Sequence, residues 1–170
     1  MTTKKLFSLG LLLAVAVSFV SCGERQSVTI DGVRWATRNV DTPGTFVRSS
    51  LDAGGLFTWY EAQNACPQGW RLPTREEAQS LSNASGEAIA LNGVPGRAVG
   101  SASNELFLPF AGFRRINGTL AYEGFEGLYW SSTEQGANAA WFLFSNINNS
   151  NNVQIQWNRN AGLSVRCVAE

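Results

Sequence analysis

The placement of three cysteines constrains this chain more than any other feature. The first, Cys22, directly follows an N-terminal segment that begins with Lys4 and Lys5 and continues as the apolar stretch 6–20. A basic start, a short apolar stretch and a small residue before the cleavage point are typical of a secretory signal peptide, and the stretch is short for a membrane span. We therefore expect a signal peptide at residues 1–21 and a mature chain outside the cytoplasm.

The stretch FVSCG at residues 19–23 resembles the lipobox of bacterial lipoproteins. In such proteins the cysteine thiol is diacylated, the chain is cut before it, and the new amine is acylated. The resemblance implies an acylated Cys22, a tether over residues 22–27 and a membrane as partner, because several acyl chains anchor firmly. We expect a lipid-anchored envelope protein of the outer membrane and leave its periplasmic or surface face open. The alternative is an ordinary secretory signal with an incidental cysteine.

Removing the acylated cysteine leaves two others, Cys66 and Cys167. In an oxidising compartment an even number of cysteines argues for a disulfide. This bridge would join the first helical region to the C-terminal strand. Closing a loop of about 100 residues stabilises by about 4–5 kcal/mol in the chain-entropy model. Two free buried thiols are the alternative.

The composition suits one folded domain over residues 28–170. Apolar residues make up 44% of the chain and charged residues only 15%, which is enough apolar material for a buried core. The 13 basic residues balance the 13 acidic residues. The signal peptide carries two lysines and no acid, so the mature net charge is −2. Without a basic surface, we expect no nucleic acid among the partners.

The local patterns predict two helices followed by a sheet. The first helix is expected over residues 57–65, and the second begins at Thr74, where Glu77 has the spacing of a capping box. Residues 84–104 are expected to be loop with one short strand. A strand and turn are predicted at 28–33, with Asp31-Gly32 in the turn, and a second extended piece at 35–40. Further strands are predicted at 106–113, 119–123, 128–132, 140–145, 153–157 and 163–168. This order describes an α+β domain.

Four short blocks then add up to a family resemblance. They are GVRWATRNV at 32–40, ACPQGWRLPT at 65–74, YWSST at 129–133 and LSVRCV at 163–168. Together they resemble the major paralogous domain first named from Fibrobacter succinogenes, which is common in Bacteroidetes envelope lipoproteins. The resemblance implies a C-type-lectin-like fold of the formylglycine-generating-enzyme branch, with two helices and a twisted antiparallel sheet. It also implies the same bridge from the first helix to the last strand.

The residues in these blocks are mainly structural in character. Trp35, Trp70 and Trp130 are large apolar side chains suited to holding loops over a core. Arg71 and Arg166 need carboxylate or carbonyl partners if they are partly buried. Because a fold does not determine a function, the blocks alone identify no activity.

A second resemblance concerns the C-terminal stretch 141–166, which is similar to the variable region of proteins diversified by retroelements. In such proteins asparagine codons are mutagenised into many others, so the resemblance implies asparagine enrichment. The enrichment is present at Asn146, Asn148, Asn149, Asn151, Asn152, Asn158 and Asn160. The alternative is that asparagine suits turns and tolerates left-handed backbone.

Several kinds of chemistry are excluded or disfavoured. The chain has no histidine, which excludes histidine-based triads and histidine metal ligands. The calcium motifs of sugar-binding C-type lectins are absent, and the two bridging cysteines do not match the active-site thiols of formylglycine-generating enzymes. We expect a non-enzymatic protein with no cofactor and no metal. A hydrolase using Glu123, Glu126 or Glu134 as paired carboxylates is a further alternative.

We therefore predict a lipid-anchored binding or adhesion module with a ligand surface near the C-terminus. Aromatic and amide side chains there suit a surface glycan or a protein, because rings stack and amides both donate and accept. The predicted contacts are Phe142, Phe144, Asn148, Asn149, Asn151, Asn152, Gln154, Gln156, Asn158 and Asn160. The alternative is a structural envelope protein without a ligand of its own.

Overall fold

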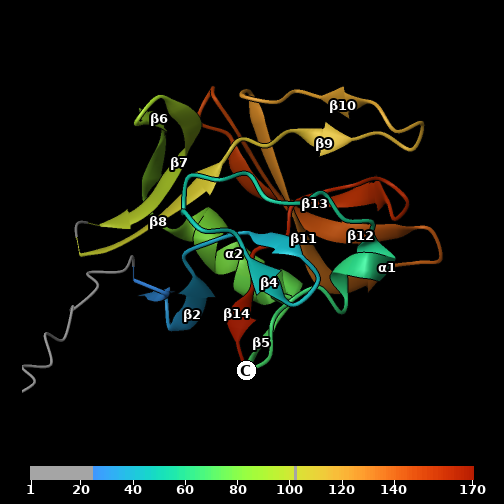
Figure 1. Cartoon of the computed structure of the whole chain (residues 1–170), viewed down its shortest axis with the longest axis horizontal. Coiled ribbons are helices and arrows are strands. Elements are labelled where there is room, and N and C mark those ends of the chain that lie inside the picture. Colours follow the sequence, from blue (N-terminus) through green and yellow to red (C-terminus); the bar gives the residue numbers. More distant parts are fainter. Residues whose placement is uncertain (1–24, 102) are drawn as a thin grey trace, which may run out of the picture.

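The computed structural model describes residues 25–101 and 103–170, except for the side chains of Ile155 and Gln156. The predicted signal peptide and the acylation site at Cys22 lie outside the described residues. Three antiparallel sheets, two small hairpins and two helices make up the described part (Figure 1). No helix within this part is long and apolar enough to cross a membrane.

The first sheet brings the two ends of the described chain together. Its strand order is β1-β2-β14-β5, with β14 between β2 and β5. The turn between β1 and β2, Asp31-Gly32, has φ of 47° and 79°, which suits the twist of a tight hairpin. The strands are β1 (Ser27–Ile30), β2 (Val33–Ala36), β5 (Trp70–Arg71) and β14 (Val168–Ala169).

The second sheet occupies the segment that we predicted to be mostly loop, so that prediction is wrong. It consists of β6 (Gly86–Leu91), β7 (Val94–Ser101) and β8 (Asn104–Pro109) in that order. Asn92 and Gly93 form its first turn with φ of 49° and 83°. Gly96 lies inside β7. A Cβ at this position would come within 2.3 Å of the Phe107 ring, so a larger residue would clash. A glycine that looked like a strand breaker is thus a packing site.

The third sheet, β11-β12-β13, separates two halves of the core. Its strands are β11 (Glu126–Gln135), β12 (Ala139–Asn146) and β13 (Asn151–Asn158). Neighbouring residues point to opposite faces, so Trp130 and Phe142 join one apolar cluster while Tyr129 and Leu143 join the other. Both faces are therefore largely covered.

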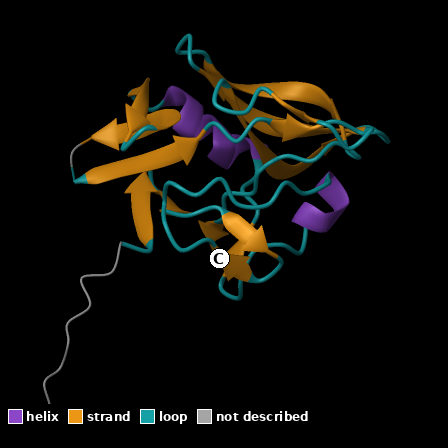
Figure 2. Cartoon of the chain, turned by 45° about the horizontal axis from the view of Figure 1, so that its top comes forward, coloured by secondary structure: helices purple, strands orange, loops and turns teal. Residues whose placement is uncertain are grey.

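The two helices are short and both begin with a capping box. In α1 (Trp59–Ala62) Thr58 pairs with Glu61, and in α2 (Arg75–Asn83) Thr74 pairs with Glu77, which confirms the predicted start of the second helix. Ala78 and Leu81 of α2 pack into the core on one face of the third sheet. Figure 2 shows α2 between the two three-stranded sheets.

The expected α+β class and its C-type-lectin-like fold are wrong. The described part of the chain is mostly β structure, with 49% in strands and 9% in helices, arranged in several small sheets. The first helix has one turn where we expected nine residues, and residues 86–101 form strands. Two small hairpins add to the strand content, β3 (Val40–Thr42) with β4 (Thr45–Phe46) and β9 (Phe113–Arg114) with β10 (Leu120–Ala121).

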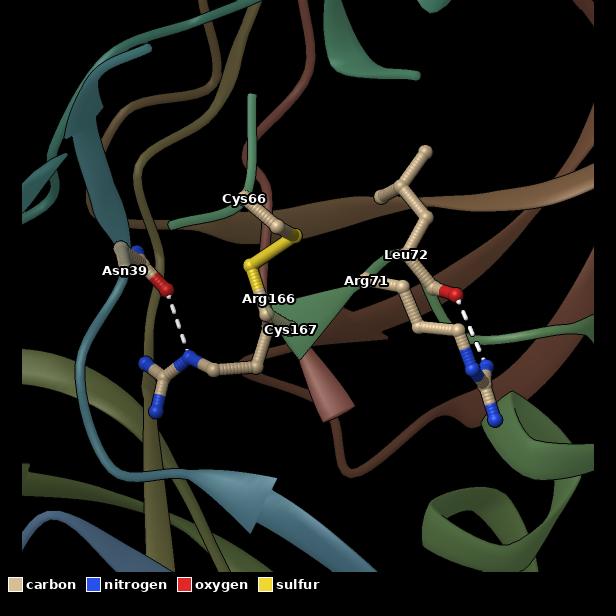
Figure 3. The surroundings of a disulfide bond; sticks show 6 residues. All are labelled: Asn39, Cys66, Arg71, Leu72, Arg166 and Cys167. Carbon is tan, nitrogen blue, oxygen red and sulfur yellow. Dashed lines mark hydrogen bonds between the residues drawn. A yellow bond between two sulfur atoms is a disulfide. The ribbon is translucent and has the colours of Figure 1, made fainter. Parts of the chain in front are cut away.

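The predicted disulfide is confirmed. Cys66 and Cys167 are bridged with their Cα atoms 6.0 Å apart, across 101 positions of sequence (Figure 3). Cys66 follows α1, and Cys167 directly precedes β14. The bridge thus ties the first helical region to the end of the chain, as the cysteine count indicated.

Candidate functional site

The two aromatic residues of the predicted ligand surface lie in the core. Phe142 is 1% exposed and packs edge-on against Trp130, with ring centroids 6.4 Å apart. Phe144 is half-buried and packs against the same cluster. Phe142 therefore offers no surface to a ligand, and both rings stabilise the covered face of the third sheet.

Several asparagines of this region hold the turn between β12 and β13. The Asn146 carboxamide oxygen accepts hydrogen bonds from the N–H groups of Asn148 and Ser150, both at 3.0 Å. Asn149 has φ of 64°, and its side-chain oxygen accepts from the N–H of Ala88 at 2.7 Å. The turn is thus fastened to the second sheet by an asparagine that also tolerates left-handed backbone.

Two more asparagines have structural partners. The Asn151 amide donates to the carbonyl of Leu81 at the end of α2, at 2.9 Å. The side-chain oxygen of Asn158 accepts from the N–H of Asn160 at 2.9 Å. These contacts explain part of the asparagine enrichment by turn and cap chemistry. Diversification by a retroelement stays a prediction.

The remaining predicted contacts lie at the solvent. Asn148, Asn152, Asn158 and Asn160 are exposed, and Gln154 is half-buried with its amide donating to Asn152 at 3.0 Å. Gln156 is on β13, but its side chain lies outside the described part. The predicted surface is therefore reduced to amides along the edge strand β13 and its two turns.

A surface that sequence analysis missed lies around the β9–β10 hairpin. Among the described residues six large apolar side chains are exposed, and four of them fall within residues 116–125. A fifth, Ile147, donates its N–H to the carbonyl of Phe125 at 3.1 Å. We call these five the apolar surface: Ile116 (70% exposed), Leu120 (49%), Tyr122 (53%), Phe125 (56%) and Ile147 (46%).

One member of the apolar surface, Tyr122, is connected to the core by a row of aromatic rings. Tyr122 stacks on Phe113 at 5.9 Å, and Phe113 meets Trp157 edge-on at 4.8 Å. Trp157 lies against Phe142 at 5.6 Å, which completes a connection to the core. Aromatic pairs of this kind favour one geometry, so the hairpin is held in place.

The sequence carried a weak signal for this surface. Ile116 and Leu120 flank the turn residues Asn117 and Gly118, and Gly124 separates Tyr122 from Phe125. The same pattern is typical of a strand, which is how we interpreted residues 119–123. Only the tertiary packing shows that these side chains face the solvent.

A cleft of about 360 Å³ lies at the start of the described chain. It combines hydroxyl groups, one cation and one carboxylate with an apolar floor. Its lining consists of Arg25, Val28, Thr37, Ser50, Leu91, Ser103, Glu105 and Phe107.

The arginines that we expected to need partners have them. Arg71 forms two hydrogen bonds of 2.7 Å with Glu77, and it also donates to the carbonyl of Leu72 (Figure 3). Arg166 is 1% exposed and donates to three neutral oxygens. Both arrangements stabilise the fold.

Two of the acidic residues considered for hydrolysis, Glu126 and Glu134, do not form a pair. Glu126 and Glu134 lie near opposite ends of β11, about 25 Å apart at the usual rise of a strand. Glu134 pairs with Arg159 at 3.0 Å, and burial raises the pKa of Glu126. Glycosidases need two carboxyl groups within about 10 Å. No cluster of three metal-binding side chains exists among residues 25–101 and 103–170.

Comparison with known families matches residues 31–169 to the Fibrobacter succinogenes major domain. The match covers most of the chain, so the chain belongs to this family, as the sequence blocks indicated. Comparisons with curated proteins and with solved structures gave no match.

Proposed function

We propose that this member of the Fibrobacter succinogenes major domain family is a lipid-anchored envelope protein that binds a partner non-covalently. The anchor is Cys22, and the binding site is the apolar surface together with the neighbouring amides of β13. The partner is another protein with exposed apolar side chains. This site keeps the β13 amides of the predicted ligand surface and leaves out Phe142, which is buried.

One observation supports this site above all. Exposed apolar side chains scattered singly are ordinary, but a gathered group marks an interaction site. Four of the six large exposed apolar side chains in the described part fall within residues 116–125, and a fifth, Ile147, is hydrogen-bonded through its N–H to the carbonyl of Phe125. Three of them, Ile116, Leu120 and Ile147, are aliphatic, which favours a protein partner over a glycan because sugars stack on aromatic faces.

The test uses the full lipidated chain in lipid nanodiscs, probed against envelope proteins and envelope glycans. The binding variant changes Ile116, Leu120, Phe125 and Ile147 to Ser, and it leaves Tyr122 in place because Tyr122 supports the hairpin. The matched control is Tyr60→Ser, which removes a side chain of similar exposure (52%) elsewhere on the molecule. We expect the quadruple variant to lose at least about tenfold in affinity and the control to bind normally.

Two results would contradict the proposal. Equal binding by the quadruple variant and the wild type would remove the apolar surface from the site. Binding only to glycans, lost in Asn152→Ala but kept in the quadruple variant, would move the site to the amides. The anchor is tested separately, because Cys22→Ser should abolish both acyl labelling and flotation with vesicles.

A further inference from the structure

The described fold begins very close to the proposed anchor. Arg25 is the first described residue and stands three positions after Cys22. A fully extended chain spans at most about 3.5 Å per residue, so the two Cα atoms are no more than about 10 Å apart. This is much less than the width of a domain of this size.

Arg25 is fixed to the body of the domain. Its guanidinium donates to the carbonyl of Ser103, and its own carbonyl accepts from the hydroxyl of Thr37. The next residue, Gln26, accepts from the N–H of Thr37 at 3.0 Å, and pairing of β1 with β2 begins at Ser27. The domain therefore has little freedom to move away from an anchored Cys22.

Three arginines line the cleft at this end of the molecule or stand within two positions of its lining residues in the sequence. Arg25 lines it, Arg38 follows the lining residue Thr37, and Arg48 lies near Ser50. Arg38 and Arg48 adjoin each other, since the guanidinium of the first donates to the carbonyl of the second at 3.5 Å. The two salt bridges of the described part involve Arg71 and Arg159, so these three cations have no carboxylate partner there.

We propose that this face docks on the headgroup layer of the bilayer that holds Cys22, with Arg25, Arg38 and Arg48 against lipid phosphates. A cation near an anionic membrane surface is attracted to the lipid phosphates. Glu105, on the cleft wall, suits the ammonium of a zwitterionic headgroup. The inference rests on the acylation proposed above.

The docking determines how the apolar surface is oriented relative to the bilayer. In Figure 1 β1 lies at the lower left and the β9–β10 hairpin at the upper right. A domain that rests on its Arg25 end therefore presents the hairpin away from its own bilayer. The partner of the apolar surface would then approach the domain from the side that faces away from this bilayer.

The experiment measures which end of the lipidated full chain faces the vesicle. Nitroxide labels are placed on Asn104→Cys, beside Ser103, and on Ile116→Cys at the far hairpin; both side chains are exposed. The vesicles contain zwitterionic and anionic lipids and a nickel-chelating headgroup lipid as relaxing agent. We expect a severalfold larger relaxation enhancement at residue 104 than at residue 116.

Two further chains control for the tether and the charges. Inserting a Gly/Ser linker of about 20 residues between Glu24 and Arg25 frees the domain, because such a linker spans roughly 25 Å. Changing Arg25, Arg38 and Arg48 to Gln removes the cations and leaves the tether short. We expect the difference between the two labels to shrink in both chains while flotation persists.

Each negative result would contradict a different part of the proposal. Equal relaxation at both labels in a chain that floats through Cys22 would overturn the docking and leave the anchor intact. A wild-type difference that survives the triple Gln change would overturn the role of the arginines. Flotation of Cys22→Ser would instead overturn the proposed acylation.

Discussion

The guanidinium of Arg166 donates to the carboxamide oxygen of Asn39 at 2.8 Å, across 127 positions of sequence, with both side chains buried. Its other nitrogens donate to the carbonyls of Ala36 and Phe107, each at 3.1 Å. Burial lowers the pKa of Arg166 to about 10, so it remains a cation at neutral pH. One side chain thus connects the last strand region with β2 and β8.

We predict that Arg166→Lys lowers the free energy of unfolding by about 2 kcal/mol or more. A single ammonium cannot match the fork of a guanidinium, so at least one buried carbonyl loses its partner. Arg71→Lys is the matched control. The side chains of Arg71 and Glu77 are 43% and 22% exposed, and ion pairs exposed to this degree contribute about 1 kcal/mol or less to stability. Urea unfolding of the three chains measures both effects, and equal losses would show that burial does not strengthen the Arg166 contacts.

The features that sequence predicted are those specified by local chemistry. The capping box at Thr74 needs only two residues three apart, and the bridge needs only an even number of cysteines in an oxidising compartment. The turn at Asp31-Gly32 follows equally from its two residues. Asn92-Gly93 carries the same signal for a hairpin, and β6 and β7 do pair there. The nearby Gly and Pro residues led us to predict mostly loop for residues 84–104.

The location of the exposed apolar surface could not be predicted, because exposure depends on what covers each face of a sheet. Alternation along β12 shows that Phe142 and Phe144 share a face, and only the packing of other segments shows that this face is buried. For the same reason the predicted strand at residues 119–123, of which Leu120–Ala121 form β10, did not show that Leu120 and Tyr122 face the solvent. Their exposure is a property of the hairpin's position over Phe113.

The disulfide should contribute strongly to stability. We expect the free energy of unfolding of the Cys66→Ala, Cys167→Ala double variant to be about 4 kcal/mol lower than that of the wild type, because the bridge closes a loop of 101 positions. Reductant should lower the melting temperature of the wild type and leave that of the double variant unchanged. Peptide mapping without reduction provides the control, and two free thiols in the native protein would contradict the bridge.

Structural and solvent-facing asparagines should respond differently to substitution. We predict that Asn149→Ala costs about 1–3 kcal/mol, because it loses the bond to Ala88 and places alanine at a φ of 64°. Asn152→Ala removes an exposed amide and should change stability by about 0.5 kcal/mol or less. Thermal unfolding separates the two, and a similar loss in both variants would mean that Asn152 also has a structural role.

The carboxylate of Glu77 should contribute stability that acid removes. Hydrogen bonding from Arg71 lowers its pKa below the ordinary 4.5. A lowered folded-state pKa means that the contribution is present above about pH 4.5 and is lost as the pH falls through the folded value. Glu77→Gln should therefore be less stable than the wild type at pH 7, and the gap should close in acid. Glu76→Gln, which removes an exposed neighbouring carboxylate without a bond to Arg71, serves as the control.

Glu126 should show the opposite dependence, because burial raises its pKa above 4.5 and its side chain has no bonded partner in the described part. The folded protein then holds the proton more tightly than the unfolded chain, so stability falls as the pH rises through the folded pKa. Glu126→Gln keeps the shape without the charge, and we expect it to be more stable than the wild type at pH 7 and equal to it below about pH 4. Unfolding curves across this range, with the exposed Glu123→Gln as control, measure the difference. A Gln variant that is less stable at neutral pH would mean that the ionised carboxylate is needed where β11 begins.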